Sequence, residues 1–248
     1  MINERINGLI NELSETELDY GLYVVAIDIG NPADITLRAI NVLNKVDFVI
    51  CEERKNGSKL LNQYGISKPL EMLNEHNEKQ QTGFLTEKII SNQVAAALVC
   101  DGGTPLFADP GSMLVQQCHY YNIPVVPVPG ASSLMSALMV SGIGYGSGQF
   151  LYYGFLPANR EERIQSLYKL RNQKRMNIVF LETPYRLKQI LGDMSRVLGS
   201  GRKGLIAYRM TFFDEKVLMG TLEELKLMAD GLPKGQFVFI LFAEKRYG

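Results

Sequence analysis

The stretch VAAALVCDGGTPLFADPG, residues 94–111, decides how this chain folds. It opens with an unbroken apolar run, Val94–Val99, which predicts a strand buried on both faces of a sheet. The run breaks into DGGTP (101–105), and open α/β sheets bind ligands just beyond such strand ends. Glycines let a backbone approach a ligand closely, so this break is a candidate binding loop. A plain strand-to-helix turn is the alternative.

Composition places the 248-residue chain among ordinary globular proteins. It is 46% hydrophobic and 21% charged, and its length fits one large domain or two small ones. The formal net charge is zero, so any nucleic-acid contact requires a local basic patch.

The three cysteines and two histidines predict no zinc site, since no CxxC spacing is present. Free cysteines also favour a reduced, cytoplasmic setting. The N-terminus has no signal-peptide pattern, and no run reaches the ~20 apolar residues of a membrane span.

Strand and helix patterns alternate through the first half of the chain. Strands are predicted at 22–27, 48–51, 69–73, 94–99 and 125–128, with helices between them and a charged loop at 52–55. This alternation predicts an α/β fold with a mostly parallel sheet covered on both faces. Residues 1–21 have the spacing of a short amphipathic helix.

The second half predicts a mixed sheet. Its strands are expected at 150–154, 177–182, 204–208, 216–221 and 237–243, and its helices at 160–170, 184–198 and 222–228. The glycine-rich GIGYGSG (142–148) follows a helix and precedes a strand, so it is a hinge and not a dinucleotide fingerprint. We therefore expect an N-terminal helix at 1–21 and domains at 22–145 and 146–248.

Three glycine-bearing loops follow strands of the first sheet, at 27–31, 100–105 and 129–133. The carboxyl ends of parallel strands share one edge, so these loops should converge on one crevice. They offer backbone N–H groups, hydroxyls and the carboxylates of Asp28 and Asp101. That set suits a small ligand with an amino-acid or ribose portion, whereas the absence of a Walker lysine argues against a triphosphate.

Further polar groups lie outside these loops. His76 in NEHNE is either a functional base or an exposed loop residue, and Glu182 and Arg186 in FLETPYR either reach the ligand or begin a helix. A basic run is either a solvated helix face or a nucleic-acid contact; it comprises Arg160, Arg163, Lys169, Arg171, Lys174 and Arg175.

The ordered segments between residues 22 and 243 resemble one known family. They are LYVVAIDIGNPADITLRAINVLNKVDFVICEE, SKLLNQYGI, NEHNE, CDGGTPLFADPG, VVPVPGASSLMSAL, GFLP and FLETPYRL. The family is the ribosomal RNA small-subunit methyltransferase I family of the tetrapyrrole methylase superfamily. The resemblance implies two α/β domains, S-adenosylmethionine in the cleft between them, and a homodimer. It also implies methylation of a cytidine ribose 2′-hydroxyl in small-subunit ribosomal RNA.

Motif positions in the family imply the site residues. Cofactor contacts are expected from Gly30, Asn31, Asp101, Gly102, Gly103, Thr104, Phe107, Ser132, Ser133, Glu182 and Ala207. Substrate contacts are expected from Arg54, His76, Asn77, Arg186, Arg171, Lys174 and Arg175. The base that accepts the hydroxyl proton is left open among Glu52, Glu53, His76 and Asp101.

The chain departs from the family pattern at four places. They are Ile27-Asp28, Glu53–Lys55, Cys100–Gly103 and Arg209–Phe212. The first two face the expected substrate side. Two alternatives therefore stay open: methylation of a tetrapyrrole or of another RNA site, and a cofactor-binding protein without catalysis.

Overall fold

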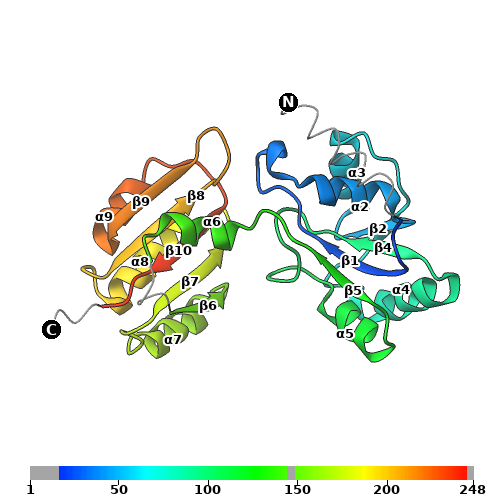
Figure 1. Cartoon of the computed structure of the whole chain (residues 1–248). Helices are drawn as coiled ribbons and strands as arrows, with labels where there is room; N and C mark the ends of the chain where they lie inside the picture. The colour runs from blue at the N-terminus through cyan, green and yellow to red at the C-terminus, as the bar shows by residue number, and fades with distance from the viewer. Residues whose placement is uncertain (1–16, 144–148, 245–248) are drawn as a thin grey trace. The chain divides into compact units, whose positions relative to one another are not determined.

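The computed structural model describes residues 17–143 and 149–244 (Figure 1). Contacts divide the chain into two compact units between Ser132 and Ser133. The predicted domain limit at 145/146 falls inside the second of these units, among the undescribed residues 144–148. The helix predicted at 1–21 lies almost wholly outside the described residues, as does most of the GIGYGSG hinge.

The first unit holds a five-stranded parallel sheet in the order β3-β2-β4-β1-β5. Its strands are β1 (Gly21–Val25), β2 (Phe48–Cys51), β3 (Leu70–Met72), β4 (Ala95–Leu98) and β5 (Val125–Val128). Its helices are α2 (Leu37–Lys45), α3 (Arg54–Gln63), α4 (Glu78–Asn92) and α5 (Ser112–Tyr120), with a short 3-10 helix η1 (Pro32–Asp34) after β1.

Helices cover both faces of this sheet (Figure 1). On one face Val25 and Ala97 pack with Leu43 of α2 and Leu61 of α3. On the other face, side chains such as Leu98 pack with α4 and α5. Every residue of β4 is buried, which explains why its sequence is a continuous apolar run.

The second unit holds a mixed sheet in the order β6-β7-β10-β8-β9. Its strands are β6 (Phe150–Gly154), β7 (Asn177–Glu182), β8 (Lys203–Tyr208), β9 (Lys216–Thr221) and β10 (Phe237–Leu241). Only β6 and β7 pair in parallel. The helices α7 (Arg160–Leu170), α8 (Leu187–Leu198) and α9 (Leu222–Ala229) cover one face, and α6 (Ser133–Val140) packs on the other. The predicted α/β fold with one parallel and one mixed sheet is confirmed.

Two helices start at other residues than the sequence predicts. Arg54 and Lys55 belong to α3 and not to a loop, because the Glu53 carbonyl already accepts the Gly57 N–H (3.0 Å). The helix predicted from residue 184 begins at Leu187, because residues 183–186 form a turn closed by Arg186 N donating to Thr183 O (3.2 Å).

Within the described part of the chain, no helix combines the length and apolar character needed to cross a membrane.

Candidate functional site

Adjacent strands β4 and β1 send their chains to opposite faces of the first sheet. The chain after β1 enters α2 on one face, and the chain after β4 enters α5 on the other. Such a switch point opens a crevice beyond the carboxyl ends of the two strands, and α/β proteins use it to bind ligands. The stretch at 100–105 therefore lies where sheet topology favours a site.

Hydrogen bonds join the three predicted loops. Gly103 O accepts from Ile27 N, and Gly103 N donates to Asp28 O, both at 2.9 Å. Thr104 Oγ1 donates to Ala131 O at 3.0 Å. The structure thus brings together residues 27–31, 100–105 and 129–132, which we call the three-loop site. Ser133 follows directly as the first residue of α6, which the contacts group with the second unit.

The two loop glycines differ in what surrounds them. Gly103 has φ +84°, and a Cβ there would lie 2.9 Å from Ile29 Cγ2 and 3.5 Å from Ala131 O. A Cβ on Gly102 would meet only Asp28 O, at 3.6 Å. Gly103 is therefore needed for packing between the loops, whereas Gly102 presents open backbone. Phe107, further along the same loop, is half exposed.

Asp28 and Asn31 stabilise the turn after β1. Asp28 accepts from Gly30 N (3.1 Å) and from the Tyr64 hydroxyl (3.0 Å). Burial, together with the Asp28 carboxylate, raises the pKa of Tyr64 to about 12. Asn31 accepts from Ala33 N and caps η1. Asp28, which departs from the family pattern, thus stabilises the loop that carries Gly30.

Carboxylates gather where β2 and β4 end. We call Glu52, Glu53, Asp101 and Asp109 the acidic cluster. Burial and then the charges of Asp101 and Asp109 raise the pKa of Glu52. Burial is also the main cause that raises the pKa of Asp109, and Asp101 contributes. Asp101 is exposed and accepts from Asn56 Nδ2 at 2.7 Å.

Asp109 and Asn56 were missed by sequence reasoning. Asp109 resembles an ordinary turn residue in ADPG, and Asn56 directly follows the stretch 52–55 that was predicted as a loop.

The remaining first-unit residues have mainly local partners. The His76 side chain is 87% exposed, and its Nε2 lies 3.5 Å from the neighbouring Glu75 carboxylate. Asn77 Oδ1 accepts from Asn74 N at 2.7 Å and so closes its own turn. Arg54 Nη2 donates to a backbone carbonyl of β3 at 3.2 Å. These contacts favour the exposed-loop interpretation of His76.

In the second unit, Glu182 and Arg186 fix the turn after β6. Glu182 Oε1 accepts from Leu156 N (3.3 Å), and Arg186 Nη2 donates to the carbonyls of Leu156 (2.9 Å) and Pro157 (2.8 Å). Burial raises the pKa of Glu182, partly opposed by Arg186. Ala207, in β8, is buried on the sheet face that packs against α6.

Comparisons with known proteins identify the family. Residues 21–226 match the family model "Tetrapyrrole (Corrin/Porphyrin) Methylases". The ribosomal RNA small subunit methyltransferase I of Haemophilus influenzae is 39% identical over 229 residues, which cover 91% of this chain and 80% of that protein. The chain belongs to the ribosomal RNA small subunit methyltransferase I family. The protein of the same name from Pasteurella multocida is 38% identical over 89% of this chain and 78% of its own length.

Solved structures agree on the fold of this methyltransferase. A diphthine synthase has a TM-score of 0.70 at 15% identity, covering 90% of this chain and 89% of its own. A cobalt precorrin-4 methyltransferase has a TM-score of 0.63 at 15% identity, and the match covers 90% of this chain and 95% of that chain. Family membership makes the protein an S-adenosylmethionine-dependent methyltransferase, as the resemblance implied.

The basic run of this methyltransferase does not form one surface. Arg163 was predicted as part of it but is fully buried, with Nε donating to Asp193 Oδ2 (3.0 Å) and Nη1 donating to Pro157 O (3.1 Å) and Ala158 O (2.9 Å). Its interpretation as a surface cation is wrong, because Asp193 of α8 provides a buried partner.

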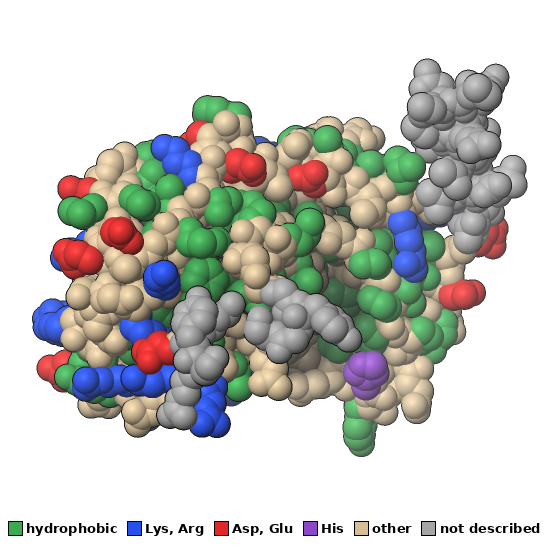
Figure 2. Space-filling model, turned by 60° about the vertical axis from the view of Figure 1, so that its left-hand side comes forward, with side chains coloured by type: hydrophobic (Ala, Val, Ile, Leu, Met, Phe, Trp, Pro, Cys, Tyr) green, Lys and Arg blue, Asp and Glu red, His purple; other side chains and the backbone are tan. Residues whose placement is uncertain are grey.

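The exposed end of the run follows α7, and we call Arg171, Lys174 and Arg175 the basic turn. Lys174 Nζ pairs with Glu244 Oε2 at 3.0 Å. Lys and Arg side chains gather toward the left of the face in Figure 2, with Asp and Glu side chains among them. The basic turn precedes β7, and Glu182 is the last residue of β7. The two therefore lie at opposite ends of this strand.

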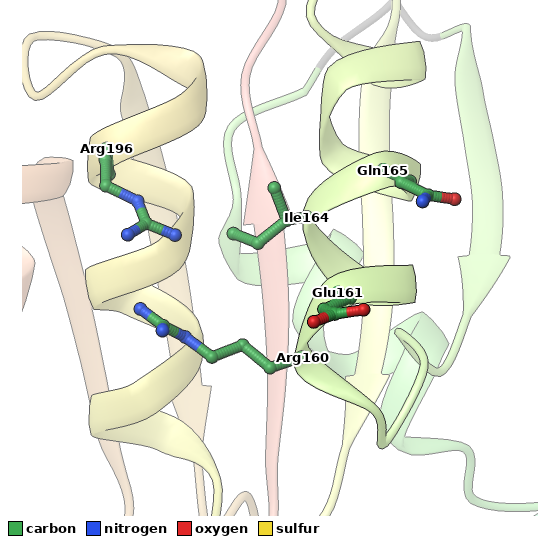
Figure 3. Close-up of a pocket in the computed structure, with 5 residues that line it drawn as sticks. All are labelled: Arg160, Glu161, Ile164, Gln165 and Arg196. Carbon is green, nitrogen blue, oxygen red and sulfur yellow. The ribbon is translucent and has the colours of Figure 1, made fainter.

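A shallow groove of about 390 Å³ lies between α7 and α8 (Figure 3). Arg160, Glu161, Ile164, Gln165 and Arg196 line it. Both arginines are turned to Asp193, at 3.5 and 3.6 Å. These cations therefore contribute to the buried charge network around Arg163.

Proposed function

We propose that this methyltransferase transfers the methyl group of S-adenosylmethionine to the 2′-hydroxyl of a cytidine ribose in small-subunit ribosomal RNA. The observation that carries the proposal is the 39% identity, over most of both chains, to a protein named for methylating that RNA. The three-loop site at the switch point supports it, because a small ligand has a backbone-lined place to bind there.

The residues of the three-loop site fit the cofactor. Gly102 leaves open space where a Cβ would stand, and the joined loops bring Gly30, Thr104 and Ser132 to one edge of the sheet. We assign the cofactor to this site. When bound, the cofactor supplies a methyl group on a sulfonium, whose departing sulfide is a good, neutral leaving group.

Positioning of the ribose hydroxyl accounts for most of the rate enhancement in this proposal. A ribose hydroxyl is a weak nucleophile, and holding it about 3 Å from the methyl carbon can remove roughly 7–11 kcal/mol of barrier. The protein's part is to orient the ribose and exclude water. The hydrogen bonds of Gly103, Asp28 and Thr104 hold the three loops together, which supports that task.

Among the four candidate bases we propose Glu52. Its pKa is raised by burial and by neighbouring carboxylates, which makes its carboxylate a stronger base than an ordinary glutamate. Asp101 is engaged by Asn56, and the side chains of His76 and Glu53 are exposed. Glu52 would take the hydroxyl proton as the oxygen attacks, a contribution of about 10²–10⁴-fold in rate.

The test is methyl transfer to small ribosomal subunits that lack native ribose methylation. The purified protein is incubated with methyl-labelled S-adenosylmethionine, and label is mapped by nuclease digestion and mass spectrometry. Label on a cytidine 2′-oxygen supports the proposal. Label on a base, or label only on an added tetrapyrrole, refutes it. Calorimetry with S-adenosylhomocysteine shows whether a protein that transfers no label still binds cofactor.

A further inference from the structure

Three strands of the second sheet end at the same edge. β6 pairs in parallel with β7, and both β7 and β8 pair antiparallel with β10. The carboxyl ends of β6, β7 and β8 therefore lie together, with the start of β10 between the last two. The loops after these strands form one row across the sheet.

Each of these loops presents an aromatic side chain to solvent. Phe155 follows β6 and is 45% exposed, Tyr185 follows β7 and is 73% exposed, and Phe213 follows β8 and is 96% exposed. We call these three residues the aromatic edge. A single exposed aromatic needs no explanation, but one on every loop of a sheet edge indicates an interaction surface.

The first two of these loops are held in place by buried groups. Glu182 and Arg186 bind the backbone of Leu156, next to Phe155, and Arg163 binds the carbonyl of Pro157. The same Arg186 closes the turn that carries Tyr185 by donating its N–H to Thr183 O. Exposure of these rings is therefore not a consequence of loose loops.

The hairpin that carries Phe213 is also constrained. Arg209 Nε pairs with Asp214 Oδ1 at 2.8 Å, and Thr211 N donates to Glu215 Oε2 at 2.7 Å. Arg209 and Thr211 both adopt positive φ, which non-glycine residues keep only where the surroundings enforce it. A nearly fully exposed Phe at the tip of such a hairpin is presented in a defined position.

Cations lie beside one ring of the aromatic edge, Tyr185, and beside Phe212, the residue before Phe213. Lys234 Nζ lies 4.7 Å from the centroid of the Tyr185 ring, and the Arg209 guanidinium lies 4.4 Å from that of Phe212. Lys234 is exposed and lies three residues before the start of β10. Aromatic faces interleaved with cations are what proteins offer to unpaired nucleic-acid strands, whose bases stack while phosphates meet the cations.

We infer that the aromatic edge binds an unpaired strand of the RNA substrate by stacking on its bases. This inference rests on the proposed function, since it names how that RNA is held. Strands lie about 4.8 Å apart, so the row from β6 to β8 spans roughly 15 Å, enough for several stacked nucleotides. Because every base has a stacking face, the row tolerates sequence and selects unpaired RNA over duplex.

The experiment measures binding of a short, labelled oligouridine by fluorescence anisotropy at fixed salt, with a matched duplex as competitor. We expect Phe213→Ala and Tyr185→Ala each to weaken binding of the single strand roughly tenfold. Phe213→Trp should keep or tighten it. The control is Tyr168→Ala, which removes an aromatic of 55% exposure on α7 and should leave the affinity unchanged.

The outcomes separate this inference from the proposed function. If the wild type methylates ribosomal RNA while both alanine variants bind oligouridine and methylate normally, the aromatic edge is refuted and the function stands. If the variants change the oligomeric state in light scattering but not RNA affinity, the row is a protein interface and the inference is wrong. If the wild type binds no RNA and transfers no label to it, both proposals fail.

Discussion

The two adjacent glycines of the three-loop site separate the packing of its loops from its contact with ligand. At Gly103 a Cβ would stand 2.9 Å from Ile29 Cγ2 on a backbone with φ +84°. At Gly102 the nearest atom, Asp28 O, is 3.6 Å from the Cβ position. Alanine at each position therefore tests a different property of one loop. Gly65 is the matched reference, because it has φ +68° and nothing within 4 Å.

The magnitudes follow from these surroundings. Left-handed backbone costs a side chain about 1–2 kcal/mol, which is all that Gly65→Ala should lose. Gly103→Ala adds an overpacking cost of about 1–3 kcal/mol, because Ile29 must move. Gly102→Ala should change stability by less than about 0.5 kcal/mol. A total loss of this size leaves a domain of ordinary stability, about 5–15 kcal/mol, folded.

Urea denaturation measures the free energy of unfolding, and calorimetry measures the affinity for S-adenosylhomocysteine. We expect Gly102→Ala to weaken binding at least tenfold at unchanged stability, and Gly103→Val to abolish binding in a protein that still folds. Equal stability of the Gly103→Ala and Gly65→Ala variants would refute the clash with Ile29. Normal binding by both Gly102→Ala and Gly103→Val would refute the assignment of the cofactor to this loop.

Three further predictions concern charged groups. Glu52→Gln should remove the acid limb of the pH–rate profile. Asp109→Asn should move that limb to lower pH, because loss of a neighbouring negative charge lowers the raised pKa of Glu52. An unmoved limb in both variants would exclude Glu52 as the base. Arg163→Met should lower the free energy of unfolding by about 3–5 kcal/mol, as it leaves Asp193 without its buried partner; a loss below ~1 kcal/mol contradicts that role. Neutralising all three residues of the basic turn should reduce the slope of log K against log salt concentration for RNA binding by up to about 2. An unaltered slope would show that the basic turn is a solvated face.

The sheet strands were predictable because their signals are local. The strands β2, β5, β6, β7 and β9 have the bounds that sequence periodicity predicts, and β4 lies inside its apolar run. The convergence of the three glycine-bearing loops was predictable too, since parallel strands place their following loops at one edge. Helix starts were harder, because backbone bonds such as that of Gly57 N to Glu53 O decide them.

Features that depend on distant partners were not predictable. Arg163 has the spacing of a surface cation, and only Asp193, thirty residues later in the chain, makes its burial possible. Glu78 looks like a solvated helix residue, yet its carboxylate accepts from Gly111 N (2.8 Å) and Met113 N (3.2 Å) and so caps α5. One sequence gives no indication of such pairings, because they depend on tertiary contacts.

The structure points to a different surface for RNA contact than the sequence does. In the sequence, RNA contact is indicated by clustered positive charges, and the basic turn is the exposed part of that cluster. In the structure that turn lies at one edge of the second sheet and the aromatic edge at the other, separated by the six residues of β7, roughly 20 Å. A single extended RNA strand would need several nucleotides to contact both surfaces. The two surfaces can therefore be tested by different measurements. Loss of stacking weakens binding at every salt concentration, whereas loss of charge weakens it mainly at low salt.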